Sequence, residues 1–389
     1  MPPKGLPRAM GIVFYIQVLY CIELRNTTLC FCEIVEGIAM GCCDKFESDA
    51  LARTLADDVG RRTVLKGIAG TVGVAAVAAG GTAHAQATKL KLAFCGQLLC
   101  VVPYEVTRHR GHFAAEGLDV ELVYTRGGSA AMQALVGGAV DYAGTSFDVA
   151  VQAYARGAKI VRFASTGRLP LFALAVAPKN AATIASIKDL ENKTVGVSAL
   201  ANADHTILLY LLAKAGANAD SIRFATLGTN VYDAVRLGQV DAAMVQEPAL
   251  TLIVKAGGKP LVNLMEIDHA ERHFGGPYEF MGVAVRTAER ARRLEEMRHL
   301  ARALTRGLKD SRTLPVEEVA AALPRELVAG GDRQQLLDIL GRYRNSLYPD
   351  SVAIDVAAAT RVEDSLKTSG QLATDVKLEG LLDRTVVGG

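Results

Sequence analysis

The chain has no tryptophan, and only 6% of its 389 residues are aromatic. Tryptophan is the preferred partner of quaternary ammonium ligands, so its absence argues against a choline- or betaine-binding cage. An excess of one charge is missing too, because 43 Lys and Arg stand against 41 Asp and Glu, a formal net charge of +2. A nucleic-acid-binding domain would have a strong basic bias, so we expect no nucleic-acid partner. Four aromatic residues could still stack on a flat ligand ring: Tyr104, Phe147, Tyr232 and Tyr278.

Motifs for several kinds of chemistry are also missing. The sequence has no phosphate-binding P-loop and no motif that pairs a nucleophile with a base. His109 and His112 stand three residues apart, but no carboxylate or third histidine joins them in sequence, so we predict no metal site and no cofactor. An apolar stretch at residues 10–22 is too short to span a membrane. Binding without catalysis requires none of these motifs.

Cysteine is scarce outside the first sixty residues. Five of the seven cysteines lie in residues 1–59, which show no other fold signal. We interpret this segment as a non-native extension or a disordered region, with Met40 as a candidate start; a metal-binding or membrane-tethered arm is the alternative. Cys95 and Cys100 could form a disulfide in an oxidising compartment, or could be two buried thiols beside a binding loop. Their spacing slightly favours free thiols.

Residues 60–85 have the features of an export signal. The twin arginines Arg61-Arg62 precede a weakly apolar run at residues 67–81 and a small-x-small cleavage site, Ala83-His84-Ala85. Lys66 and the glycine-rich core favour the twin-arginine route over an ordinary secretory signal or a buried helix. We therefore predict a periplasmic protein that is cleaved near Ala85.

A helix–strand unit occurs twice, one hundred residues apart. Residues 127–146 are predicted to form a loop, a short helix that ends at glycine, a strand and a second loop. Residues 228–244 repeat this order up to the strand. Six positions are identical without a gap: Gly128, Ala134, Gly138, Val140, Asp141 and Ala143 match Gly228, Ala234, Gly238, Val240, Asp241 and Ala243. The repeat predicts two similar open α/β lobes, each with a mostly parallel sheet. We expect both aspartates of the repeat to make structural hydrogen bonds.

The domain organisation follows from two apolar, extended segments. Residues 170–177 and 278–285 are predicted to join the lobes as a two-strand hinge. The first lobe would begin with residues 86–175 and the second would comprise residues 176–279. Residues 280–389 would complete the first lobe and add C-terminal helices that pack on it. We also predict a loop over residues 95–100 and one helix near residues 104–115.

Several segments resemble one known family. Residues 111–120, Gly-His-Phe-Ala-Ala-Glu-Gly-Leu-Asp-Val, are similar to the G-x-F-x-x-E-G-L-D-V segment of periplasmic solute-binding proteins of the nitrate/sulfonate/taurine class. Residues 187–190 (Ile-Lys-Asp-Leu) and 240–248 match that family too, and the resemblance covers about residues 89–285. It implies a type II periplasmic binding protein, a monomer that closes on a small anionic, zwitterionic or heteroaromatic solute. The partner implied is an inner-membrane ABC permease.

An enzyme is the alternative, because this family shares a superfamily with the thiamine-pyrimidine synthases; a pyrimidine-precursor binder is a related possibility. Those enzymes carry a cysteine-rich motif within the folded domain. Here Cys30-Phe31-Cys32 precedes the export signal and would be removed with it. We therefore expect a binding protein with no catalytic residues.

Ligands of open α/β sheets bind beyond the carboxyl ends of the strands. The loops predicted there, together with the residue just before the first hinge segment, supply our candidate ligand-binding residues. They are Gln97, Gly128, Ser129, Thr145, Ser146, Arg168, Ser198, Asn202, His205, Thr229, Asn230, Gln246 and Glu247. Several of them begin helices, where free N–H groups and the helix dipole favour an anion.

Some of these candidates have a structural alternative. Ser129 and Thr229 could serve only as helix caps. His205 could be a surface histidine, and Arg168 a solvated arginine at the hinge. Glu247 could accept from a ligand or form a salt bridge across the cleft.

Overall fold

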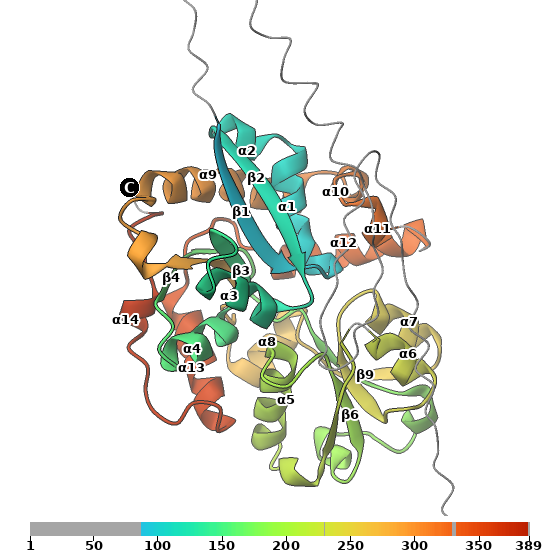
Figure 1. Ribbon diagram of the computed structural model, residues 1–389. Coiled ribbons are helices and arrows are strands. Elements are labelled where there is room, and N and C mark those ends of the chain that lie inside the picture. The colour runs from blue at the N-terminus through green and yellow to red at the C-terminus, as the bar shows by residue number, and fades with distance from the viewer. Residues whose placement is uncertain (1–86, 229, 329–331, 388–389) are drawn as a thin grey trace, which may run out of the picture. The chain divides into compact units, whose positions relative to one another are not determined.

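The computed structural model describes residues 87–228, 230–328 and 332–387. The predicted extension at residues 1–59, the predicted export signal at residues 60–85 and Thr229 lie outside the described residues. Within the described residues, ten strands form two five-stranded sheets (Figure 1). The part of the chain described contains no helix that is both long and apolar enough to cross a membrane.

The first sheet combines four early strands with one late strand. Its spatial order is β2 (Leu118–Thr125), β1 (Thr88–Cys95), β3 (Tyr142–Ser146), β10 (Met281–Arg286) and β4 (Ile160–Ser165). β1 pairs in parallel with β2 and β3, whereas β10 is antiparallel to both β3 and β4. Every residue of β3 is buried, so the centre of this sheet lies in the core.

The second sheet repeats this arrangement. Its spatial order is β7 (Arg223–Thr226), β6 (Thr194–Val197), β8 (Ala242–Val245), β5 (Ala173–Val176) and β9 (Lys259–Asn263). β6 pairs in parallel with β7 and β8, and β5 is antiparallel to both β8 and β9. The two similar open α/β lobes predicted from the repeat are therefore confirmed, and we call them the first and second lobe.

The prediction of mostly parallel sheets is confirmed, because four of the five strands in each sheet run in the same direction; the exception is one strand, β10 or β5, that is antiparallel to both of its neighbours. β5 and β10 each enter a sheet after the chain has crossed from the other lobe. Ala173 of β5 pairs with Val245 at the end of β8, and Met281 of β10 pairs with Ser146 at the end of β3. Since each crossing strand starts at the carboxyl ends of its parallel neighbours, it must run against them.

The two crossings lie side by side. The first occupies residues 166–172 and the second residues 275–280. Tyr278 N donates to Arg168 O at 3.0 Å, and Phe280 N donates to Gly167 O at 2.9 Å. This backbone pairing makes the two-strand connection between the lobes. The lobe boundaries at residues 175 and 279 stay a prediction.

Helices follow the parallel strands in both lobes. Those before residue 275 are α1 (Leu98–His109), α2 (His112–Ala115), α3 (Gly128–Val136), α4 (Phe147–Ala155), α5 (Ala203–Lys214), α6 (Val231–Arg236), α7 (Ala249–Lys255) and α8 (Ile267–Phe274). The single helix predicted near residues 104–115 is wrong, because Gly111 adopts φ +72° and separates α1 from α2. The predicted loop is shorter too, since α1 already starts at Leu98 and includes Cys100.

The C-terminal part is helical, as expected. It contains α9 (Leu294–Thr313), α10 (Val316–Ala321), α11 (Arg325–Val328), α12 (Arg333–Leu347), α13 (Val356–Thr368) and α14 (Leu378–Leu381). α9 packs on α1 and α2 of the first lobe. The prediction that all these helices pack on that lobe is wrong, because α13 contacts both α4 and α5, and Tyr343 of α12 accepts from Asn263 of β9 at 3.0 Å. The C-terminal helices therefore pack on both lobes.

The repeated motif has a structural origin. Gly138 and Gly238 end α3 and α6 with φ of +80° and +67°, a backbone conformation that favours glycine. Asp141 accepts from Lys91 N at 2.7 Å, and Asp241 accepts from Thr194 N at 2.8 Å. Each repeat aspartate therefore ties its own strand to a backbone N–H group of a neighbouring strand, which confirms the structural role expected for both.

Candidate ligand-binding site

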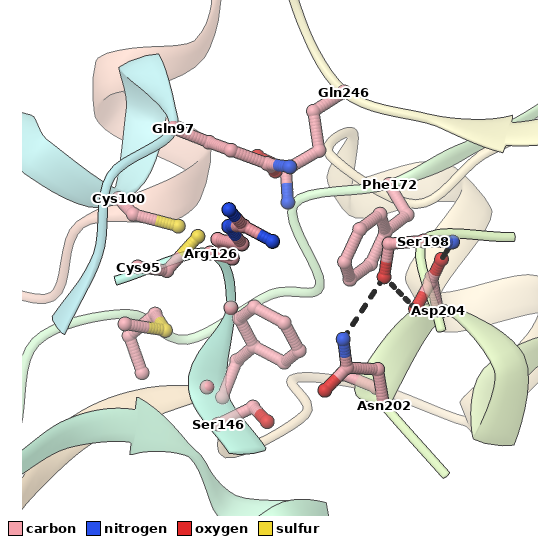
Figure 2. A pocket seen from close by; sticks show the side chains of 15 residues that line it. Cys95, Gln97, Cys100, Arg126, Ser146, Phe172, Ser198, Asn202, Asp204 and Gln246 are labelled. Carbon is pink, nitrogen blue, oxygen red and sulfur yellow. Dashed lines mark hydrogen bonds between the residues drawn. The ribbon is translucent and has the colours of Figure 1, made fainter. Parts of the chain in front are cut away.

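A pocket lies where the carboxyl ends of the parallel strands of the two sheets face one another (Figure 2). β1, β2 and β3 lead to Gln97, Arg126 and Ser146 on one side, and β6 and β8 lead to Ser198 and Gln246 on the other. The cavity is narrow, with a volume of about 30 Å³, and it opens to solvent. This is where residues from both lobes can contact one ligand.

The pocket wall contains buried polar atoms that the described residues leave without a hydrogen-bond partner. They are Gln97 Oε1, Ser146 Oγ, Asn202 Oδ1 and Gln246 Oε1. A buried polar group without a partner costs roughly 1–3 kcal/mol, so such groups gather where a ligand or water satisfies them. A side-chain amide can also turn to present its NH₂ group, so this wall can serve a ligand with acceptor atoms.

Four helices begin at this wall. Their N-cap residues are Gln97 of α1, Gly127 of α3, Ser146 of α4 and Asn202 of α5, and all four line the pocket. None of the four caps its own helix through a side-chain hydrogen bond. The free N–H groups of the first turns and the positive ends of the helix dipoles favour a negatively charged group in the pocket.

The start of α3 differs from the prediction. Its N-cap is Gly127, so Ser129 lies inside the first turn and is not the cap. A side chain would crowd the position before Ser129, because a Cβ on Gly128 would lie 2.6 Å from Thr145 Oγ1. Thr145 is buried behind the wall and donates to Gly128 O at 3.1 Å. Thr145 and Ser129 therefore lie beside the pocket but do not line it.

Arg126 was missed in the sequence analysis. It follows β2 and directly precedes Gly127, and its side chain lies within the pocket between the two lobes (Figure 2). It is the pocket's one cationic side chain among the lining residues described. Its place at the carboxyl end of a parallel strand was a usable signal, because the same rule had selected Gly128 two residues later.

A second residue that sequence analysis missed holds the other side of the pocket. Asp204, in the first turn of α5, accepts from Ser198 Oγ at 2.8 Å and from the Ser198 backbone N–H. Asn202 Nδ2 in turn donates to Ser198 Oγ at 3.0 Å (Figure 2). Burial raises the pKa of Asp204. Asp204 thus positions Ser198 and, through it, Asn202, two of the polar side chains that reach the pocket from the second lobe.

Two predicted site residues lie away from the pocket. Arg168 donates from Nε to Ser346 O at 3.0 Å and from Nη2 to Asn345 O at 2.6 Å, in the last turn of α12. An arginine at a helix C-terminus satisfies carbonyls that lack intrahelical partners, which explains why its guanidinium is not at the cleft. His205 Nδ1 accepts from Ala201 N at 3.3 Å and its ring packs edge-on against Phe224.

The remaining candidates belong to the second lobe. Glu247 is buried, and its carboxylate accepts from Thr251 N and Thr251 Oγ1, both at 3.0 Å, instead of forming a salt bridge across the cleft. Burial raises the pKa of Glu247. Asn230 is exposed at the start of α6 and lines neither this pocket nor the next.

A second pocket continues from the first and is mostly apolar. The two share Gln97, Phe172, Ser198, Asp204 and Gln246. The second one has a volume of about 310 Å³ and also opens to solvent, and its apolar lining includes Leu98, Val231, Tyr232, Met244 and Leu252. Of the four aromatic residues considered for stacking, Tyr232 lines it, whereas the other three are buried in the core. Phe172 and Phe280, which were not predicted, also face the site.

Cys95 and Cys100 are free thiols on the wall of the first pocket. Their sulfur atoms point toward one another (Figure 2). The interaction between the two thiols lowers the pKa of Cys95 and raises the pKa of Cys100. The two cysteines are therefore not joined by a disulfide, in agreement with the free thiols that their spacing in the sequence favoured.

The described residues contain no group of three or more His, Cys, Asp and Glu side chains placed to hold a metal ion. His112, one of the two histidines considered as ligands, instead makes a 2.7 Å hydrogen bond through Nε2 to Asp310.

Comparisons with known proteins agree with this architecture. A family model described as NMT1/THI5 like matches residues 101–318, more than half of the chain. No curated protein matches the sequence.

Solved structures resemble the whole of the described region. A protein from Bordetella bronchiseptica RB50 is 23% identical, with a TM-score of 0.68 over 77% of this chain and 95% of that chain. The alkanesulfonate-binding protein SsuA from Xanthomonas axonopodis pv. citri, bound to MOPS, is 18% identical, with a TM-score of 0.60 over 77% of this chain and 100% of that one. The periplasmic nitrate-binding protein NrtA from Synechocystis PCC 6803 is 12% identical, with a TM-score of 0.61 over 77% and 87%. These likenesses confirm the predicted periplasmic-binding-protein fold.

Proposed function

This chain belongs to the NMT1/THI5-like family, and we propose that it is the solute-binding component of an ABC importer. It would bind a small organic anion between its lobes, release it unchanged to an inner-membrane permease, and act as a monomer. Solved proteins of the same fold that bind alkanesulfonate and nitrate support this class of function. The observation that supports this proposal most directly is the composition of the pocket. Four helix N-termini, Arg126 and unpaired polar atoms from both lobes lie together there.

The adjoining apolar pocket favours an organic anion over an inorganic one. An acidic head group bound by Arg126 and the helix N-termini would place the rest of the ligand against Phe172 and toward Leu252. Each methylene group that becomes buried there contributes about 0.8 kcal/mol. Nitrate has no apolar part that could contact the second pocket, so a sulfonate with an alkyl or ring substituent is the better fit.

Isothermal titration with nitrate and a series of alkanesulfonates tests this proposal. We expect affinity to rise by about fourfold for each added methylene group until the apolar pocket is filled. The variant Leu252→Ala should weaken binding of hexanesulfonate but not of methanesulfonate. Leu237→Ala is the matched control, because Leu237 is 59% exposed and lines neither pocket. Absence of binding for every anion, or equal affinity for nitrate and hexanesulfonate, would contradict the proposal.

Export is a separate part of the proposed function. If the twin arginines direct translocation, replacing Arg61 and Arg62 together by lysine should leave the protein uncleaved in the cytoplasm. The secreted native chain should begin at Gln86, as read from its intact mass. Arg53→Lys, a basic residue outside the signal, should be exported normally. If the intact mass shows that the exported protein begins upstream of Arg61, this signal is ruled out.

A further inference from the structure

The two thiols of the pocket have no role in the function proposed above. Cys95 is the last residue of β1, and Cys100 lies in the first turn of α1. Both are buried, with 6% and 3% of their surfaces exposed, yet both line the interlobe pocket. Since each sulfur points toward the other (Figure 2), a bond between them requires no exchange of partners elsewhere in the fold.

We infer that Cys95 and Cys100 are a redox-active pair that closes reversibly to a disulfide and thereby weakens ligand binding in this pocket. The effect on binding rests on the proposed function; the disulfide itself does not. A disulfide can stabilise a fold without affecting a ligand. Here, however, the segment between the two cysteines includes Gly96 and Gln97, and Gln97 lines the pocket.

The chemistry is thiol–disulfide exchange with an organic disulfide such as oxidised glutathione. The Cys95 thiolate attacks one sulfur of the oxidant, the oxidant's S–S bond breaks, and one thiolate leaves and takes up a proton. Cys100 then loses its proton and attacks the Cys95 sulfur, which releases the second thiol. The protein loses two protons and two electrons in all, and the oxidant gains them and becomes two thiols. Cys95 is the first nucleophile because its interactions with the Cys100 thiol and with the backbone of Gln97 lower its pKa and favour the thiolate.

Closure should alter the pocket through Gln97. This residue is the N-cap of α1, and its carbonyl oxygen accepts from Cys100 N at 3.0 Å. The side chains of Gln97 and Gln246 reach toward one another from the two lobes (Figure 2). A covalent S–S bond is shorter than a contact between two thiols, so it draws the first turn of α1 toward the end of β1. The amide of Gln97 then leaves the position from which it serves a ligand held between the lobes.

Peptide mass spectrometry tests the disulfide without any ligand. Trypsin releases residues 92–108, a peptide that contains Cys95 and Cys100 and none of the five N-terminal cysteines. After treatment of the full chain with oxidised glutathione and alkylation of free thiols, this peptide should be two hydrogen atoms lighter than the dithiol and carry no alkyl group. Dithiothreitol should restore the doubly alkylated form. A peptide that stays fully alkylated at every glutathione ratio would overturn the inference.

Titration with MOPS, the sulfonate bound in the Xanthomonas structure, tests the effect on the pocket. We expect the oxidised protein to bind MOPS about fivefold more weakly than the reduced protein, which corresponds to one lost hydrogen bond. By linkage, MOPS should disfavour the disulfide by the same factor. The variants Cys95→Ser and Cys100→Ser should remove any dependence of affinity on redox state, although their own affinities can differ from that of the native chain.

The outcomes separate the two proposals. Equal MOPS affinity in both redox states would overturn the inference that the disulfide weakens ligand binding. A redox effect that persists in the doubly substituted chain would overturn it as well, because the five N-terminal cysteines remain there. Absence of MOPS binding in either state would contradict the proposed sulfonate ligand, whereas the disulfide is still judged from the peptide mass.

Discussion

Replacing Arg126 with alanine should weaken binding of a sulfonate by roughly tenfold to a hundredfold, because a charge-assisted hydrogen bond contributes about 1.5–3 kcal/mol. Arg126 is the cationic side chain of the pocket, and it lies on an exposed loop between β2 and α3. Its removal should therefore change the free energy of unfolding very little. Arg126→Lys should restore only part of the affinity, since an ammonium group does not reproduce the planar fork of a guanidinium. Isothermal titration and urea unfolding measure the two quantities separately.

Arg168→Ala is the matched control for this prediction. Arg168 was a candidate site residue from the sequence, but its guanidinium donates to carbonyls in the last turn of α12. We expect this variant to keep its sulfonate affinity and to lose about 1–2 kcal/mol of stability through the unsatisfied carbonyls. If Arg168→Ala abolishes binding while Arg126→Ala does not, the site described here is placed wrongly.

The largest effect on stability is expected at Arg162. Its side chain is fully buried in β4, and Nη2 lies 2.8 Å from Glu279 Oε1 and 2.9 Å from Phe280 O. Nη1 donates to Thr145 O at 3.0 Å, at the end of β3. One guanidinium thus joins the first sheet to the crossing that leads into β10. Arg162→Met leaves the Glu279 carboxylate buried without its partner, which costs about 3–5 kcal/mol.

The pH dependence of this variant gives a further check. Burial already raises the pKa of Glu279 in the native chain, and loss of Arg162 removes the charge that opposes this shift. A carboxyl whose folded-state pKa is raised favours folding while it is protonated, and this contribution is lost as the pH rises through its folded pKa. The destabilisation measured by urea unfolding should therefore be smaller in acid than at neutral pH. The double variant with Glu279→Gln should recover part of the lost stability; if it is less stable than Arg162→Met alone, the ion pair is not the cause.

The sequence predicted the repeating framework because that framework depends on local patterns. Alternating apolar residues indicated β1, and glycines at Gly138 and Gly238 indicated the ends of two short helices that carry the repeat. The loops that follow parallel strands could be selected as well, since the chain direction at a strand's end does not depend on distant residues. Gln97, Gly128, Ser146, Ser198, Asn202 and Gln246 were predicted in this way, and all of them line the interlobe pocket.

Other features depend on residues that are distant in the sequence. Arg168 was predicted near a ligand because it precedes the crossing, but the end of α12, almost 180 residues later, supplies carbonyls that bind it. Arg126 and Phe172 lie in the pocket only because the two lobes face each other there. The antiparallel placement of β5 and β10 likewise follows from the crossings between lobes. Local periodicity therefore determines which elements form and where their loops lie, whereas packing across the two lobes decides which charged side chains remain free to meet a ligand.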